Sequence, residues 1–172
     1  KAREDLEKVI AEIDATAREK FLECFEAVKV VFDELFKRLF NGGETELKLT
    51  GDGEILDSGL EVEVTVPGKR RQNLLLLSGG ERALTAMALI FSLIKVKPTP
   101  FVVLDEIDAP LDDSNVGRFA ELLKYFSEDS QFIVVTHNKG SMEAAGTLYG
   151  VTMQKPGIST LISMKLTELP AN

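Results

Sequence analysis

The chain has 172 residues, of which 44% are hydrophobic and 28% are charged, a composition typical of a globular protein. Its formal net charge of −8 argues against a chain whose main task is to grip nucleic acid, because that task usually needs a basic face. A single cysteine, Cys24, excludes an intrachain disulfide and fits a reducing compartment. No apolar run reaches the roughly 18 residues of a membrane-spanning helix, and no signal peptide is visible. We therefore expect a cytoplasmic protein with no membrane partner.

The first 40 residues predict one long helix. Apolar side chains recur along it at steps of three and four, the spacing of a coiled-coil seam: Leu6, Ile10, Ile13, Ala17, Phe21, Cys24, Val28, Val31, Leu35 and Leu39. From Phe21 onward additional phenylalanines widen the stripe, which is typical of a helix that packs onto a globular body. We expect a coiled-coil or neck helix at residues 1–40, ended by Asn41, Gly42 and Gly43, that docks onto a lobe formed by residues 41–172.

The lobe is expected to have an α/β fold. A strand, a helix and a second strand follow one another, and both strands are apolar without alternation, which indicates a parallel sheet covered on both faces. The helix at residues 82–96 is apolar nearly all round, so burial on most sides is expected. The expected elements are strands near 47–49 and 62–66, that helix, a strand at 101–104, a helix at 114–126, a strand at 132–135, a short helix at 141–145, and strands at 149–153 and 159–166.

The junction before the helix reads Leu-Ser-Gly-Gly-Glu at residues 77–81. Ser78 and Glu81 have the spacing of a capping box, in which each side chain satisfies a backbone N–H at the helix start. Capping gives no reason for Gly79 and Gly80, which cost helix stability. Bare N–H groups at the positive end of a helix, beside a hydroxyl, form an anion site. The three cations at residues 69–71 are expected to lie in a solvated loop.

Polar residues also follow the two apolar strands, where ligands bind in open α/β sheets. Asp105 and Glu106 end the first strand and His137 follows the second. An aspartate there can hold Mg²⁺ together with phosphates and water, and the adjacent glutamate can polarise a water that attacks a phosphate. Each feature alone has a simpler explanation, an exposed turn for the acids and a satisfied polar group for the histidine. Together with the serine-glycine-glycine start, their order is the layout of an ATP-binding-cassette (ABC) ATPase.

Four stretches make the resemblance specific: residues 77–81, FVVLDEIDAPLDD at 101–113, QFIVVTHNKGSMEAA at 131–145 and LYGVTM at 148–153. They resemble the C-terminal half of the ATPase head of bacterial structural maintenance of chromosomes (SMC) proteins, and the resemblance covers about residues 20–167. It implies the C-terminal lobe of an ABC-type head, with the helix at 1–40 as the returning arm of the coiled coil. The implied function is ATP-driven head dimerisation and ATP hydrolysis in chromosome condensation and segregation.

The resemblance also implies roles for individual residues. Asp105 would hold Mg²⁺ through water, Glu106 would be the general base and His137 the histidine that senses the γ-phosphate. The signature motif, which contacts ATP bound to the opposite head, would be Ser78, Gly79 and Gly80. The D-loop, which crosses the dimer interface, would be Ala109, Pro110, Leu111 and Asp112, with proline where many SMC heads have alanine and hence without an N–H at that position.

One departure from a complete head is plain in the sequence. The 172 residues contain no G-x-x-x-x-G-K-[ST] loop to cradle phosphates. The cofactors ATP and Mg²⁺ would then need an N-terminal lobe of the same head and a second head. Further partners that the resemblance implies are DNA and a kleisin subunit. The kleisin would contact residues 17–31 and the strands at 148–166. The implied localisation is the cytoplasm, in association with the nucleoid.

Other functions remain open from the sequence. Coiled-coil repair ATPases, of the recombination-repair or zinc-hook type, also divide the head and are the closest rivals. A membrane-transporter ATPase shares the motifs but usually continues Asp-Glu with Pro-Thr, where this chain has Ile107-Asp108. A non-catalytic interaction module is an alternative from a different functional class. It suits the chain taken alone, because the 172 residues contain no phosphate loop.

Overall fold

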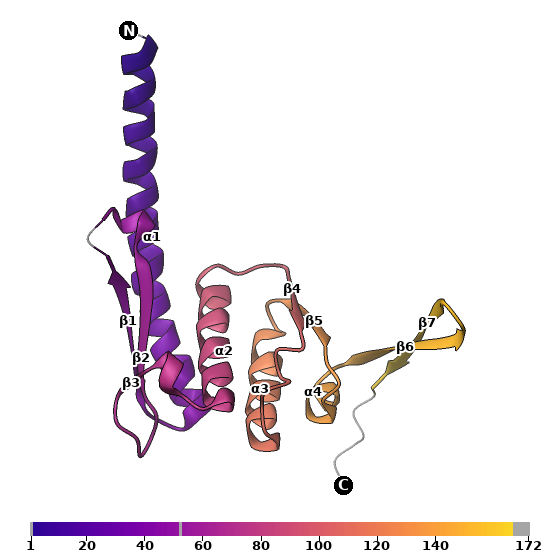
Figure 1. Ribbon diagram of the computed structural model, residues 1–172. Coiled ribbons are helices and arrows are strands. Elements are labelled where there is room, and N and C mark those ends of the chain that lie inside the picture. The colour runs from indigo at the N-terminus through magenta and orange to yellow at the C-terminus, as the bar shows by residue number, and fades with distance from the viewer. Residues whose placement is uncertain (1, 52, 167–172) are drawn as a thin grey trace. The chain divides into compact units, whose positions relative to one another are not determined.

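The computed structural model describes residues 2–51 and 53–166 (Figure 1). Their packing divides the chain into two compact units, Lys1–Thr99 and Pro100–Asn172. The helix at the N-terminus belongs to the first unit. The expected neck at residues 1–40 and lobe at 41–172 stay a prediction. Among the described residues, no helix has both the length and the apolar character needed to cross a membrane.

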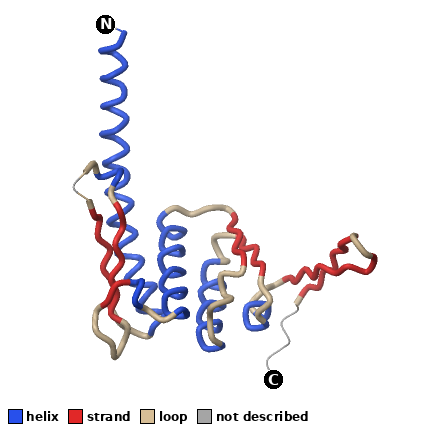
Figure 2. The backbone as a smooth tube through the Cα atoms, viewed as in Figure 1, coloured by secondary structure: helices blue, strands red, loops and turns tan. Residues whose placement is uncertain are grey.

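The first unit consists of two helices and a small antiparallel sheet (Figure 2). The sheet has the strand order β1-β2-β3, and Leu47 on β1 lies opposite Val62 on β2. Its elements are α1 (Ala2–Phe40), β1 (Glu44–Thr50), a 3₁₀ turn (Ile55–Asp57), β2 (Gly59–Thr65), β3 (Gln72–Asn73), a second 3₁₀ turn (Leu74–Leu76) and α2 (Gly79–Val96). The two strands expected from alternation are confirmed, whereas the short β3 and both 3₁₀ turns carry no periodic signal.

Helix α1 confirms the predicted long helix and its change of character. Near its N-terminus the apolar side chains of Leu6, Ile10 and Ile13 are exposed. Farther along, the stripe enters the core of the unit, with Phe32 and Phe36 fully buried and the rings of Phe36 and Phe40 stacked 4.3 Å apart. This second half of α1 packs against β1 and α2. A coiled-coil partner for the exposed turns stays a prediction.

The predicted end of α1 is confirmed by its backbone. Asn41, Gly42 and Gly43 all have positive φ, at 56°, 129° and 92°, and the Gly42 N–H donates to the carbonyl of Lys37 at 2.8 Å. A Cβ on Gly43 would lie only 2.4 Å from the carbonyl oxygen of Thr65. Glycine is therefore required at position 43, both by the left-handed backbone and by the close approach of β2.

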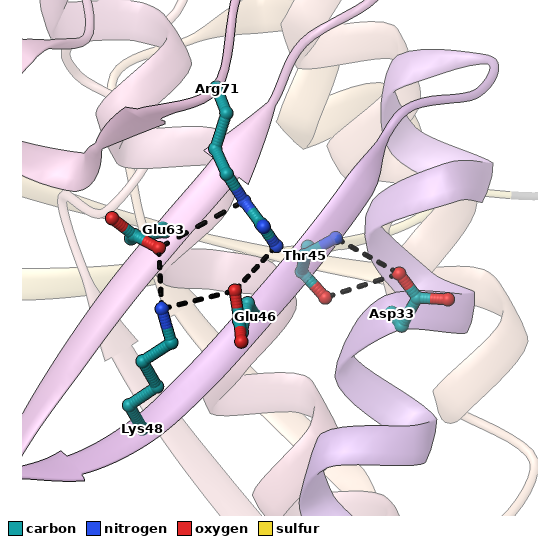
Figure 3. A network of polar contacts seen from close by, with 6 residues as sticks. All are labelled: Asp33, Thr45, Glu46, Lys48, Glu63 and Arg71. Carbon is teal, nitrogen blue, oxygen red and sulfur yellow. Dashed lines mark hydrogen bonds and ion pairs between the residues drawn. The ribbon is translucent and has the colours of Figure 1, made fainter.

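A polar network ties α1 to the sheet (Figure 3). The Asp33 carboxylate accepts from the N–H and the hydroxyl of Thr45, at 3.0 and 3.3 Å. Burial would raise the pKa of Asp33, but the hydrogen bonds from Lys37 and Thr45 outweigh it and hold that pKa below its ordinary value. On the sheet, ion pairs join Glu46 and Glu63 to Lys48 and Arg71.

The second unit pairs two parallel strands beside a helix and ends in a hairpin. Strands β4 and β5 pair in parallel, and Asp105 lies opposite Val135 at their ends. The elements are β4 (Phe101–Asp105), α3 (Asp113–Phe126), β5 (Gln131–Val135), α4 (Lys139–Glu143), β6 (Thr147–Lys155) and β7 (Ile158–Lys165). The core gathers Leu104, Val116, Phe119, Leu122 and Phe126. This confirms the expected strand–helix–strand order, the parallel pairing and the final hairpin.

The expected burial of β4 and β5 on both faces is wrong for the described chain. Phe101, Val103, Ile133 and Val135 share one face of the pair and are 49–59% exposed. The opposite face is half-buried or buried. The expected burial of α2 is confirmed for Leu84, Met87 and Phe91 but not for Ile90 and Leu93, which are exposed. Uniformly apolar sequence predicts that a surface will be covered, but it does not say that the same chain supplies the cover.

Replacing Gly43 by alanine should destabilise the first unit by at least about 1 kcal/mol, because alanine is strained at positive φ and its Cβ would clash with backbone. Gly117→Ala is the matched control, since Gly117 lies inside α3 and its Cβ would meet nothing within 4 Å; it should stabilise by up to about 1 kcal/mol. Urea unfolding of both variants measures the changes. A Gly43→Ala variant as stable as the unmodified chain would contradict this assignment.

Candidate functional site

Helix α2 begins with the predicted capping box. The Ser78 N–H donates to Glu81 Oε2 at 3.2 Å, and the Glu81 N–H donates back to Ser78 Oγ at 3.4 Å. Lys69 Nζ adds an ion pair to Glu81 Oε1 at 2.7 Å. The hydrogen bonds from Lys69, first, and from Ser78 lower the pKa of Glu81. The helix therefore starts at Gly79, three residues before the expected Arg82.

The fold does not require glycine at position 79. A Cβ there would meet nothing within 4 Å, and the backbone is not in the left-handed region. As residues of the first turn, Gly79 and Gly80 have N–H groups without an intrahelical acceptor. The helix start is thus an open surface with free backbone donors, and the residue type at position 79 has no explanation in the packing of this unit.

Parallel pairing brings Glu106 and His137 together in the second unit. The Glu106 N–H donates to the carbonyl of Val135 at 2.9 Å, which extends the β4–β5 pairing past Asp105. His137 Nδ1 then lies 4.0 Å from Glu106 Oε1, and the two side chains are 74% and 62% exposed. Glu106 has φ 48°, a strained backbone for a residue other than glycine. A carboxylate and an imidazole therefore face solvent side by side at the carboxyl ends of the two strands.

Asp105 is the last residue of β4 and is exposed. Among the described residues, no group of three or more His, Cys, Asp or Glu side chains is placed to hold a metal ion. One exposed carboxylate fits Mg²⁺, which prefers one or two carboxylates with phosphate and water oxygens over an all-protein cage. Magnesium binding by Asp105 stays a prediction.

The expected D-loop is an ordered turn between β4 and α3. The Ala109 N–H donates to the carbonyl of Glu106, and the Leu111 N–H to that of Asp108, both at 3.1 Å. Asp112 caps α3 by accepting from the Asn115 N–H at 2.9 Å, and this hydrogen bond is the main reason that the pKa of Asp112 is lowered. Leu111 is buried, whereas Ala109, Pro110 and Asp112 are exposed. The turn thus presents three of its four residues to solvent.

Sequence reasoning missed Asp108. Its side chain is 1% exposed and accepts hydrogen bonds from the hydroxyls of Thr136 and Ser141. An acid in an acidic loop gives no periodic signal of burial. The expected solvated loop at 69–71 is also only partly right, because Lys69 pairs with Glu81 and Arg71 with Glu46. The signature residues lie in the first unit, and the strand-end residues lie in the second.

Comparison with known proteins identifies the class. Residues 3–160 match the family model described as "RecF/RecN/SMC N terminal domain", so the chain belongs to this family. The description names an N-terminal domain and does not by itself assign the chain to the C-terminal half of a head.

A curated relative indicates which proteins of this family the chain is similar to. The chain is 54% identical over 167 residues to the Chromosome partition protein Smc of Bacillus subtilis, covering 97% of this chain but only 14% of that protein. The chain is thus similar to one segment of a much longer protein.

Solved structures show that the fold is that of an SMC head. A chain described under ATP-driven dimerization and DNA-stimulated activation of SMC ATPases is 41% identical with a TM-score of 0.77, over 86% of this chain and 89% of that one. The Smc head domain of Pyrococcus furiosus, with an extended coiled coil and bound to the C-terminal domain of ScpA, is 41% identical with a TM-score of 0.79, over 94% of this chain and 40% of that one. The fold is therefore consistent with an ABC-type ATPase head, as expected.

Glu81→Ala should lower the free energy of unfolding by about 1 kcal/mol, because the capping box and the Lys69 pair are both lost. Gly79→Ala should leave it unchanged or slightly higher, since the added Cβ meets open space. Thermal melting of the two variants measures both effects. A large loss of stability in Gly79→Ala would show that the fold needs this glycine after all.

Proposed function

We propose that the chain is the C-terminal half of an SMC ATPase head and acts in chromosome condensation and segregation through ATP-driven head dimerisation and hydrolysis. The observation that carries the proposal is the Glu106–His137 pair at the ends of two parallel strands. The open glycine at the start of α2 and the similarity to Chromosome partition protein Smc support it. The helix at residues 1–40 is assigned to the coiled-coil neck, and residues 41–172 to the lobe.

The strand-end residues Asp105, Glu106 and His137 would have different roles in ATP hydrolysis. Glu106, whose side chain is 62% exposed, would accept a proton from the water that attacks the γ-phosphate. His137 lies beside Glu106 and would sense the γ-phosphate by contacting it. Asp105 would hold Mg²⁺, which neutralises charge on the phosphates when bound. The exposure of all three side chains in this chain fits a site that another lobe and nucleotide cover.

The start of α2 would act on a nucleotide held by a second head. Gly79 and Gly80 have N–H groups at the positive end of the helix, where phosphate binds. The Ser78 hydroxyl lies beside them and donates to Glu81 Oε2 at 2.7 Å, so it would exchange this partner for the phosphate. The D-loop residues Ala109, Pro110, Leu111 and Asp112 would lie at the same dimer interface. Of these, Asp112 already caps α3, so its contribution across the interface would come from its backbone or its second oxygen.

The partners follow from what the 172 residues lack and from the relatives. Without a phosphate loop in the sequence, an N-terminal lobe must supply the cradle for ATP. The exposed apolar face of β4 and β5 suits such a lobe. A kleisin subunit is proposed by analogy with the Pyrococcus head bound to the C-terminal domain of ScpA. DNA is a further proposed partner, which places the assembled protein at the nucleoid in the cytoplasm.

Two other functions are distinguishable from this one. The matched family also includes RecF and RecN, so a coiled-coil repair ATPase of the recombination-repair or zinc-hook type would use the same residues. The 54% identity to a chromosome partition protein favours the SMC assignment. A non-catalytic interaction module would bind partners through the same apolar face but would hydrolyse no ATP in any assembly.

The decisive experiment mixes the chain with an SMC N-terminal lobe that carries a phosphate loop and measures ATP hydrolysis. The pair should turn over ATP, whereas neither part alone should. Glu106→Gln should keep ATP binding and trap dimerised heads but slow hydrolysis by about 100-fold or more, because only the base is lost. No turnover by the unmodified pair would favour the interaction module, and normal turnover by Glu106→Gln would remove Glu106 from its role.

Ser78→Arg tests the role of the helix start on a second head. The bulky cation should leave ATP binding to a single assembled head intact but abolish ATP-driven dimerisation, since it fills the space for the incoming phosphate. Gel filtration with ATP, in the Glu106→Gln background, measures dimer formation. Gly117→Ala is the control that should dimerise normally. Unimpaired dimers of Ser78→Arg would reject the role in trans.

A further inference from the structure

Asp108 is a buried acid next to the site that none of the roles above uses. Its side chain is 1% exposed. One carboxylate oxygen, Oδ2, accepts from Thr136 Oγ1 at 2.6 Å and also from Ser141 Oγ. Thr136 directly precedes His137, and Asp108 follows two residues after Glu106. A single oxygen atom thus joins the two segments that carry the Glu106–His137 pair.

We propose that Asp108 is a positioning residue that locks the turn carrying Glu106 to the loop carrying His137. The proposal rests on the proposed function for what these two side chains do. It goes further in assigning the separation of Glu106 and His137 to a buried acid whose hydrogen bonds go to Thr136 and Ser141.

On one side, hydrogen bonds hold Asp108 to the Glu106 turn. The Ala109 N–H donates to the carbonyl of Glu106, and the Leu111 N–H donates to the carbonyl of Asp108. Asp108 therefore lies inside a compact turn whose first residue is Glu106. Any displacement of the Asp108 side chain is passed to this turn.

On the other side, the same hydroxyl organises the loop with His137. Besides donating to Asp108, Thr136 Oγ1 accepts from the Asn138 N–H at 2.9 Å. Asn138 Oδ1 accepts from the Gly140 N–H at 3.0 Å and so caps α4, the helix that carries Ser141. The residues on both sides of His137 are thereby fixed, while the imidazole itself remains exposed.

The positions of the exposed Glu106 and His137 side chains depend on the backbone that carries them. Glu106 and His137 lie 4.0 Å apart and both are mostly exposed, so their separation is set by the backbones beneath them. The second oxygen of Asp108 is buried without a hydrogen-bond partner among the described residues. A buried polar atom left unpaired costs stability. Folding alone gives no reason for an acid here, whereas alignment of the pair does, because small misplacements of catalytic groups cost about 100-fold in rate.

The test uses the assembled head, formed by the chain and its N-terminal lobe. Asp108→Asn and Thr136→Val should each lower kcat by about tenfold or more and change KM by less than about threefold. The double variant should be no slower than the slower single variant, because both break one link. Thr136→Ser keeps the hydroxyl and should hydrolyse ATP at the rate of the unmodified chain. Ser92→Ala removes a buried hydroxyl that bonds within α2 and should have no effect.

A spectroscopic measurement on the 172-residue chain separates this link from the ATPase function. His137 is its only histidine, so its Hε1 proton gives one assignable NMR resonance. Asp108→Asn and Thr136→Val should shift that resonance, and Thr136→Ser and Ser92→Ala should not. The NMR comparison tests the link even if the unmodified head hydrolyses no ATP. Absence of ATP hydrolysis would instead reject the proposed function.

The proposal would be overturned if Asp108→Asn and Thr136→Val both left the His137 resonance unchanged. It would also be overturned if both variants hydrolysed ATP at the rate of the unmodified chain. If Asp108→Asn fails to fold, the comparison of Thr136→Val with Thr136→Ser decides. Loss of folding in both Asp108→Asn and Thr136→Val, monitored by thermal melting, would show that the contact is structural alone and would also overturn it.

Discussion

The parallel pairing of β4 and β5 is the constraint on which the strand-end site depends. Parallel strands end at the same edge of a sheet, so pairing Asp105 with Val135 brings the next residues of both strands together. The hydrogen bond from the Glu106 N–H to Val135 carries this register one residue past the strand. Two side chains 31 residues apart in the chain thereby come within 4.0 Å of each other.

The second unit leaves an apolar surface open. One face of β4 and β5 is uncovered although its residues are apolar, and exposed apolar patches of this kind mark interaction surfaces. The 172 residues also contain no phosphate loop. A head divided between two segments, as we propose, accounts for both observations.

The start of α2 combines a structural and a functional demand at adjacent residues. Ser78 and Glu81 satisfy the helix end through the capping box, and this requirement is met within the unit. Gly79 is not needed for that purpose, because its Cβ would meet open space. The cost of a glycine in a helix is therefore offset only by something outside the unit, which in our proposal is a phosphate.

The sequence alone predicted most of the elements, though not β3 or the two 3₁₀ turns, and the residue types of the candidate site. The 3.6-residue period over residues 1–40, the capping box at Ser78 and the acids and histidine after apolar runs depend on neighbours in the chain, which local rules describe. Only tertiary structure decided what is buried. It left one face of β4 and β5 open, because coverage needs a partner that hydrophobicity cannot specify. It also buried Asp108, because a carboxylate is stable there only when hydroxyls from Thr136 and Ser141, 28 and 33 residues away, converge on it.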